Sequence, residues 1–217
     1  MKTRDKIIQA SIELFNEHGE RTITTNHIAA HLGISPGNLY YHFRNKQDII
    51  QSIFKQYEAH LESSFQPYQE QKLDVEMLVT YFDAMFYVLW KFRFFYANLT
   101  DILGQDEKLK ADYLHIQQMV QMRATRIIEQ MNNDNVITLT EDEVPQLADT
   151  MKLVLASWIS YKLAQSSKTT ITKACLYEGV LRVIMITKAY AMADSIDTFS
   201  RLETHYNQLM TQADVVA

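Results

Sequence analysis

The side chains best suited to recognition chemistry lie within residues 24–46 of the 217-residue sequence. A helix that begins with small residues can approach a phosphate or a base closely through its backbone N–H groups. The amide of Asn38 can hydrogen-bond to a base edge. Gly37 is unfavourable inside a short helix, so a close approach to a ligand would account for it. The first candidates for such contacts with a phosphate or a base are Thr25, Asn26, Ser35, Pro36, Gly37 and Asn38.

Thr25 has a second interpretation, because a threonine at a helix start can also serve as an N-cap. Its hydroxyl and backbone N–H suit a phosphate, and both roles are compatible. Asn26 follows it and can contact either the nucleic-acid backbone or a base edge.

Four helices are expected to position these residues. A broad apolar face predicts a first helix that ends near Gly19, and apolar spacing predicts a second over 25–32. Gly33 then ends this second helix, and Ser35-Pro36 is typical of the start of the next one. The third helix runs to about residue 43. A fourth, capped by Asn45, continues to about residue 65. The apolar face of the first helix consists of Ile7, Ile8, Ala10, Ile12, Leu14 and Phe15.

A helix, a tight turn and a second short helix form a helix-turn-helix arrangement, whose second helix lies in the DNA major groove. Several elements coincide in order over residues 4–55: Ala10…Leu14-Phe15…Gly19, Thr24-Thr25…Ile28-Ala29, Gly33-Ile34-Ser35…Gly37…Leu39-Tyr40…His42-Phe43 and Asn45-Lys46. This stretch resembles the DNA-binding domain of the TetR family of bacterial transcriptional regulators.

The resemblance implies DNA contacts by Tyr40 and His42, with Tyr41 as the next candidate. It also implies a phosphate contact by Lys46. Packing within the small domain is the alternative for the aromatic residues. The family often has a basic residue where Asn26 and Pro36 stand here, so the base preference at this point is left open.

The rest of the chain is expected to be helical as well. With five Gly and three Pro, few tight turns can be built, so hairpins are not expected. We predict an all-α protein with a helix-turn-helix domain at 1–55, its fourth helix continuing to about 65. A larger helical domain is expected at 66–217, beyond a boundary at 66–72. Its expected helices are 74–97, 107–132, 143–165, 173–193 and 196–212, with 98–106 as an interruption.

Nine of the 24 aromatic residues fall within residues 81–96. A helix that is apolar nearly all round is buried on most sides, so solid core is one interpretation. Family members resembling this chain bind an effector among the middle helices, which favours a pocket lined by aromatic and methionine side chains. The expected lining residues are Phe82, Met85, Phe86, Trp90, Met119, Met122, Trp158 and Tyr161.

Family resemblance also implies a homodimer in which two long C-terminal helices pair with those of a second copy. The alternative is packing within one chain, which the apolar stripes alone do not distinguish. Two recognition helices would meet half-sites about 34–36 Å apart. The expected interface residues are Leu155, Tyr177, Val180, Leu181 and Ile184.

Charge is divided unevenly along the chain. The net charge of −5 combines +2 over residues 1–55 with −7 over the remainder, which fits a binding module joined to a second unit. No catalytic constellation is recognisable, so we expect no enzyme, no cofactor and no metal site. A single cysteine and the lack of a long apolar run predict a cytoplasmic protein with no membrane partner.

The sequence thus predicts a homodimeric repressor that an apolar or aromatic small molecule releases from a palindromic operator on double-stranded DNA. In the alternative, a DNA-binding regulator takes no small ligand and acts through a protein partner or as an activator. The fourth helix would link the two domains. An all-helical enzyme with a DNA-binding head would require catalytic residues that the sequence lacks.

Overall fold

Helices are the main structural elements of the described part of the protein. The structure, a computed structural model, describes residues 2–64, 66, 75–166 and 170–215. Apart from helices, these ranges hold one isolated antiparallel bridge between Ile137 and Ala191. The expected all-α class is therefore confirmed. Most of the expected boundary at 66–72 lies outside the described residues.

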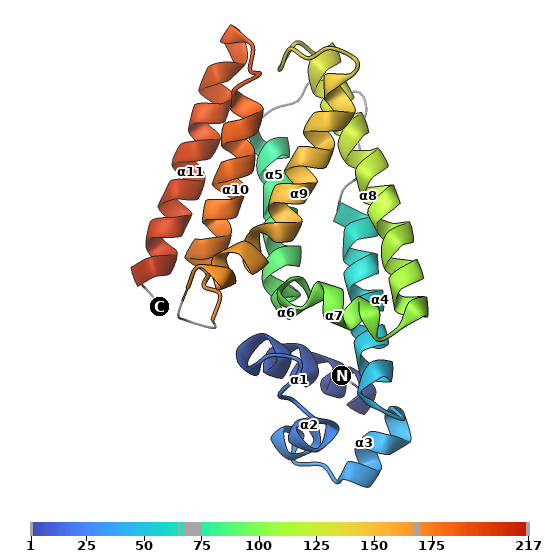
Figure 1. The fold of residues 1–217 in the computed structure, drawn as a ribbon. Coiled ribbons are helices and arrows are strands. Elements are labelled where there is room, and N and C mark those ends of the chain that lie inside the picture. The colour runs from blue at the N-terminus through green and yellow to red at the C-terminus, as the bar shows by residue number, and fades with distance from the viewer. Residues whose placement is uncertain (1, 65, 67–74, 167–169, 216–217) are drawn as a thin grey trace.

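The N-terminal helices form a compact head below the rest of the molecule (Figure 1). We use "head" for α1 (Thr3–His18), α2 (Thr25–Leu32), α3 (Pro36–His42) and the first half of α4 (Lys46–Ser64). Its core contains side chains of every one of these helices, because each contributes at least one fully buried apolar residue. Among them are Ile7, Phe15, Ile28, Leu39 and Ile49.

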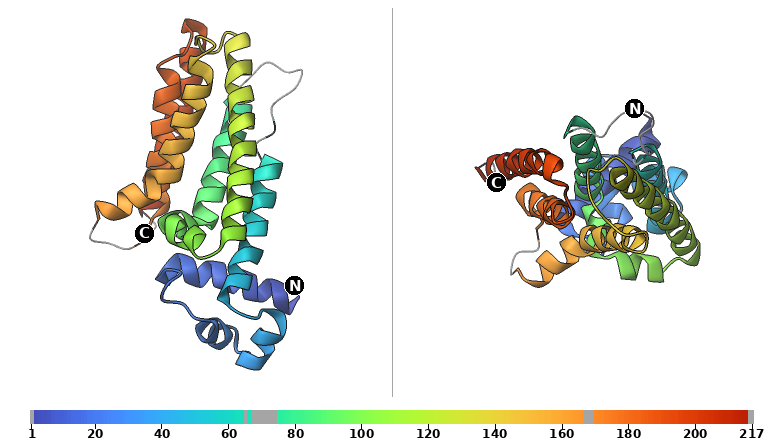
Figure 2. Two further views of the ribbon diagram at one scale, coloured as in Figure 1. Left: turned by 45° about the vertical axis from the view of Figure 1, so that its right-hand side comes forward. Right: turned by 90° about the horizontal axis from the view of Figure 1, so that it is seen from above.

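The remaining helices form the body, which stands above the head (Figures 1 and 2). It comprises α5 to α11, together with the second half of α4. Two helices at its outer side, α10 and α11, run next to each other over their length (Figure 1). The bounds of the body helices are α5 (Val75–Lys91), α6 (Arg93–Ala97), α7 (Leu99–Gly104), α8 (Glu107–Asn133), α9 (Glu143–Ala164), α10 (Lys173–Lys188) and α11 (Ile196–Val215).

Two expectations about the middle helices were wrong. The helix expected over 74–97 is broken at Phe92 into α5 and α6, and residues 98–106, expected to be an interruption, contain α7. The break is stabilised from the head. Asn16 Nδ2 donates to the Lys91 carbonyl oxygen and its Oδ1 accepts from the Phe94 backbone N–H, both at 2.9 Å. A residue 75 positions away thus satisfies backbone groups that the break leaves unpaired.

Helix α10 also ends earlier than its apolar spacing predicts, at Lys188 rather than near 193. Residues after it pair with the short apolar segment 136–139, where the Thr138 N–H donates to the Tyr190 carbonyl oxygen at 2.9 Å. This segment packs in the body core, with Ile137 only 1% exposed.

Candidate nucleic-acid interface and ligand cavity

The turn between α2 and α3 is fixed by a cap at each helix end. Thr24 caps α2, where its hydroxyl accepts from the His27 backbone N–H and the His27 ring accepts from the Thr24 backbone N–H. Gly33 ends α2 at φ +64, a conformation that favours glycine. Ser35 caps α3 by accepting from the Asn38 backbone N–H at 3.2 Å. These local bonds orient α3 relative to α2.

The outer face of α2 and α3 carries the side chains expected to contact DNA. Tyr40 is 49% exposed and Tyr41 86% exposed, whereas His42 is half-buried. The Tyr40 hydroxyl lies 3.1 Å from the Thr25 hydroxyl, so the structure joins two candidates that the sequence treated separately. Also exposed on this face are Asn26, Ser35, Pro36, Gly37 and Asn38.

The structure does not support a phosphate contact for Lys46. Its ammonium group lies 2.6 Å from the Glu20 carboxylate and donates to the carbonyl oxygens of Glu20 (2.9 Å) and Ile23 (3.3 Å). Since an ammonium has three protons, these three acceptors use all of them. Glu20 is 3% exposed, so Lys46 neutralises a buried charge within the head.

Arg44 is better placed for a phosphate. It lies two residues beyond His42, the last residue of α3, its side chain is exposed, and it has no ion pair among the described residues. Two other head arginines are engaged elsewhere: Arg4 donates to the Ser52 hydroxyl at 2.8 Å, and Arg21 pairs with Asp101 of α7. Sequence reasoning counted Arg44 only as a charge, because no motif marks it.

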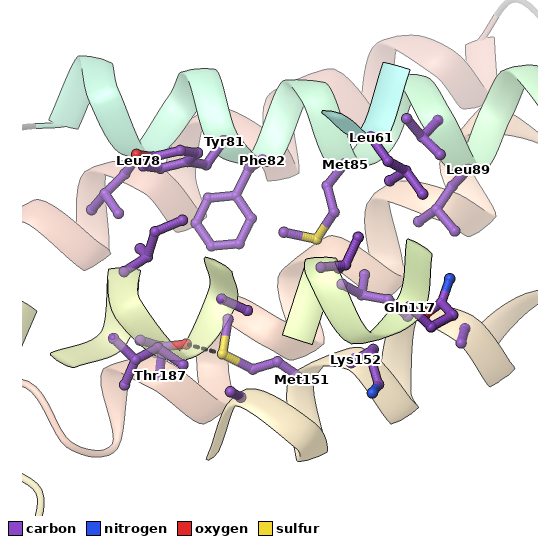
Figure 3. Close-up of a pocket in the computed structure, with 18 of the residues that line it drawn as sticks. Leu61, Leu78, Tyr81, Phe82, Met85, Leu89, Gln117, Met151, Lys152 and Thr187 are labelled. Carbon is purple, nitrogen blue, oxygen red and sulfur yellow. Dashed lines mark hydrogen bonds between the residues drawn. The ribbon is translucent and has the colours of Figure 1, made fainter. Parts of the chain in front are cut away.

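The body contains an apolar cavity of about 140 Å³. Its walls come from α4, α5, α6, α8, α9, α10 and α11. Met85 and Met151 point into it, and Phe82 lies near Leu78 at one end (Figure 3). A comparable apolar cavity of about 150 Å³ stays dry and binds a ligand the size of benzene.

A polar group occurs in this wall where α4 meets α6 and α8. The Tyr57 and Tyr96 hydroxyls lie 3.1 Å apart, and the Gln117 amide donates to the Tyr57 hydroxyl at 3.1 Å. Burial raises the pKa of both tyrosines, well above the ordinary value for Tyr57, because a phenolate would lose its hydration. Both hydroxyls therefore remain protonated.

Two of the eight expected lining residues, Phe82 and Met85, do line this cavity. The predictions for the other six were wrong because their side chains pack or point elsewhere. Phe86 stacks on Tyr177 with ring centroids 4.1 Å apart. Trp90 lies under the Arg93 guanidinium at 4.0 Å. Two more residues do not reach the cavity because their side chains are exposed to solvent, Met122 at 58% and Tyr161 at 51%.

The last two of the six are Met119 and Trp158. Met119 packs against the core cluster that joins head and body. Trp158 donates to the Cys175 carbonyl oxygen at 2.7 Å and lies on Gly179, where an added Cβ would approach the indole to 2.8 Å. That glycine allows α9 and α10 to pack closely around the indole.

Three of the five expected interface residues are unsuited to contact with a second copy. Val180 and Ile184 are fully buried inside one chain, and Leu155 lines the cavity. Tyr177 and Leu181 are half-buried. Helix α10 does carry the expected apolar stripe, but α11 covers it. Phe199, Leu202 and Tyr206 of α11 belong to the same core cluster as Val180 and Ile184.

Head and body are joined by both packing and hydrogen bonds. Phe15 of α1 packs on Phe94 of α6 with ring centroids 5.2 Å apart, next to the Asn16 bonds described above. On α4, the Gln51 amide donates to the Asp106 carboxylate at 2.6 Å. Hydrogen bonds to Leu109 and Gln51 lower the pKa of Asp106, so this link persists as a carboxylate at neutral pH.

Comparison with protein-family profiles identifies the class of protein to which this chain belongs. The profile of "Bacterial regulatory proteins, tetR family" matches residues 7–53, and that of "Bacterial transcriptional repressor" matches residues 56–199. The chain belongs to the TetR family of bacterial transcriptional regulators, and it is a regulator rather than an enzyme.

Individual relatives agree with this assignment. A TetR-family regulator from Marinobacter aquaeolei VT8 has 36% identity and a TM-score of 0.84, over 95% of this chain and 99% of that one. The SmeT–triclosan complex has the same fold at 16% identity and a TM-score of 0.58, over 88% of this chain and 92% of that one. The regulator UidR of Escherichia coli K12 is 41% identical over 54 residues, 25% of this chain and 28% of UidR. The matches to curated relatives thus span about a quarter to a half of those relatives' own length.

Two further properties concern the described residues alone. None of their helices has an apolar run of the length that crossing a bilayer requires. No cluster of three or more His, Cys, Asp or Glu side chains in these ranges is placed to hold a metal ion.

Proposed function

We propose that the protein is a homodimeric repressor that an apolar small molecule releases from a palindromic operator. One observation carries this proposal: α4 begins in the head at Lys46 and supplies Tyr57 and Leu61 to the cavity wall. A ligand in the body thus touches the helix on which the head is built.

On the DNA side, α3 enters the major groove with its N-terminal residues against base edges. Asn38 and Tyr40 are exposed on that helix, and the Thr25 hydroxyl next to Tyr40 lies at the start of α2. Arg44 takes the phosphate contact first expected of Lys46. Small exposed residues at 35–37 permit a close approach of the α3 N-terminus.

A second copy pairs through the outer face of α10 and α11. Four large apolar side chains are exposed near the C-terminal end of α10, in the turn that follows it and at the first residue of α11, and such a cluster is unusual on a surface that stays in water. To bind an operator, such a dimer must present its two α3 helices to successive major grooves, about 34–36 Å apart. The residues are Met185 (50% exposed), Tyr190 (37%), Met192 (39%) and Ile196 (48%).

Release follows if the ligand binds better to a dimer whose heads are wrongly spaced for DNA. Linkage demands such a preference, since a ligand with equal affinity for both forms shifts nothing. Expansion of the cavity against Tyr57 displaces α4, and the Asn16 bonds pass movement of the α5–α6 break to α1. A complex of the neighbour SmeT with triclosan supports a small ligand within this fold.

Selection from random DNA duplexes tests the DNA part of the proposal. We expect enrichment of an inverted repeat whose half-sites are about one helical turn apart, bound by two chains per duplex in sedimentation. A single unrepeated site bound by one chain would contradict the dimer. A dimer that keeps its operator affinity with every cavity ligand would instead support a regulator without a small effector.

A further inference from the structure

We propose that the effector is a neutral, mainly apolar molecule with one hydrogen-bond acceptor oxygen, to which the Tyr57–Tyr96 hydroxyl pair donates. This inference rests on the proposed function, since it concerns the ligand of the same cavity. It adds the chemical group by which that ligand is selected and the residues that select it.

The argument begins with the protons of the two hydroxyls. Their oxygens are 3.1 Å apart, so one proton lies between them, and Gln117 donates to Tyr57 rather than accepting from it. Whichever tyrosine donates, the second hydroxyl proton has no acceptor among the residues that the structure describes. Tyr57 is 2% exposed and Tyr96 8% exposed.

A buried donor without an acceptor is costly, at about 1–3 kcal/mol. Both tyrosines line the cavity, so an acceptor oxygen on a ligand can meet the spare proton there. Thr187 does not offer an equivalent site, because its hydroxyl already donates to the Val183 carbonyl oxygen at 2.9 Å. The spare donor therefore sets the polar end of the ligand near Gln117, away from Thr187 (Figure 3).

The same wall disfavours an anion. Burial raises the pKa of both tyrosines, so they supply a neutral donor and no charge. Lys152 is the one cation among the described wall residues, and its ammonium lies 3.5 Å from Asp149. A carboxylate would lose its hydration for a mainly hydrocarbon wall, which is expensive without a dedicated partner. A ketone, ester, ether or phenol suits the site better than an acid.

Three ligands of nearly the same shape test this selection. Acetophenone carries a neutral acceptor oxygen, α-methylstyrene has a methylene in its place, and benzoate is anionic. Each is titrated calorimetrically into the full-length protein and into the double variant Tyr57→Phe/Tyr96→Phe. The ratio of acetophenone to α-methylstyrene affinity is compared between the two proteins, because this comparison cancels the different solubilities of the ligands in water.

We expect the ratio to fall about two- to tenfold in the double variant, as one net hydrogen bond is lost. Unchanged affinity for α-methylstyrene would verify that the cavity is intact. Each single variant keeps one hydroxyl with a free proton, so it should keep most of the preference. Benzoate should bind most weakly to the wild type.

The proposal is overturned if both neutral ligands bind and their ratio is the same in the two proteins, or if benzoate binds as tightly as acetophenone. If neither neutral ligand binds the wild type, the proposed cavity function fails instead. Infrared spectroscopy of acetophenone bound to the wild-type protein tests the same hydrogen bond without any variant. The carbonyl stretch of bound acetophenone should lie below its value in hexane, and a hexane-like frequency would contradict the hydrogen bond.

Discussion

The head and the body differ in how completely their helices are capped and packed. Within the head, side-chain caps close the starts of α2, α3 and α4, a left-handed glycine ends α2, and the buried Glu20 has a dedicated lysine. The body instead contains a break in its central helix, a cavity of about 140 Å³ and a hydroxyl pair with a spare donor.

The contrast indicates which part can respond to a ligand. Local bonds over short sequence separations hold the recognition helix in one orientation relative to α2. The body leaves space that costs stability while it is empty, and the proposed mechanism requires that filling this space repositions the helices around it. The predictions below alter one region at a time, in order of decreasing effect.

The largest effect is expected for Lys46→Met. It leaves the Glu20 carboxylate buried and unpaired, which should lower the free energy of unfolding by about 3–5 kcal/mol in chemical denaturation. Lys55→Met, which changes an exposed lysine of the same helix, should alter it by about 0.5 kcal/mol or less. Normal stability with weaker DNA binding would restore Lys46 as a phosphate contact.

Tyr40→Ala removes a ring from the outer face of α3 without disturbing the core. Operator affinity, measured by fluorescence anisotropy, should fall about tenfold or more, since a lost base-side contact costs ~1–3 kcal/mol. Tyr161→Ala serves as the matched control, because that body tyrosine is 51% exposed against 49% for Tyr40. Equal losses in the two variants would mean that the ring does not mark the DNA-binding face.

Asn16→Ala removes the side chain that links the head to the α5–α6 break of the body. Removal of its bonds to Lys91 and Phe94 should cost on the order of 1 kcal/mol of stability. The main readout is the ratio of operator affinity without and with a cavity ligand, which should move towards one. Asn207→Ala, at an exposed asparagine of α11, should keep the wild-type ratio. If Asn16→Ala also keeps it, the coupling runs through α4 alone.

The smallest effect is expected for Arg44→Ala. Loss of one phosphate contact per half-site should weaken binding to all DNA sequences alike and reduce the slope of log affinity against log salt by roughly one per half-site. Arg126→Ala, an exposed arginine of α8, provides the comparison. A changed base preference in Arg44→Ala would place this side chain in a groove.

The difference between the regions also explains what the sequence could predict. Apolar spacing located α2, and Gly33 and Ser35 marked its end and the start of α3, because these signals act on neighbouring residues. The N-cap of α2 is Thr24, so the interpretation of Thr25 as an N-cap was wrong. The break at Phe92 depends on Asn16, and the engagement of Lys46 depends on Glu20. Contacts between residues that lie far apart in the sequence, or that belong to no motif, leave no local signal in the sequence.

Cavity residues were predicted less well for a related reason. Apolar spacing identifies the buried stripe of a helix, but it does not tell whether the stripe meets another side chain or empty space. Phe82 and Phe86 lie one turn apart on α5, yet one lines the cavity and the other stacks on Tyr177. The small residue Gly179, which explains the position of Trp158, likewise acts across helices.

The central claim is that occupation of the body cavity changes how the head holds DNA. The most direct test compares operator affinity with and without saturating acetophenone, in the wild type and in Ala124→Leu, whose larger side chain fills part of the cavity. The account predicts weaker operator binding on adding acetophenone to the wild type, and a smaller change, relative to its own ligand-free affinity, in the variant. Acetophenone that binds the wild type without changing its operator affinity would contradict the account.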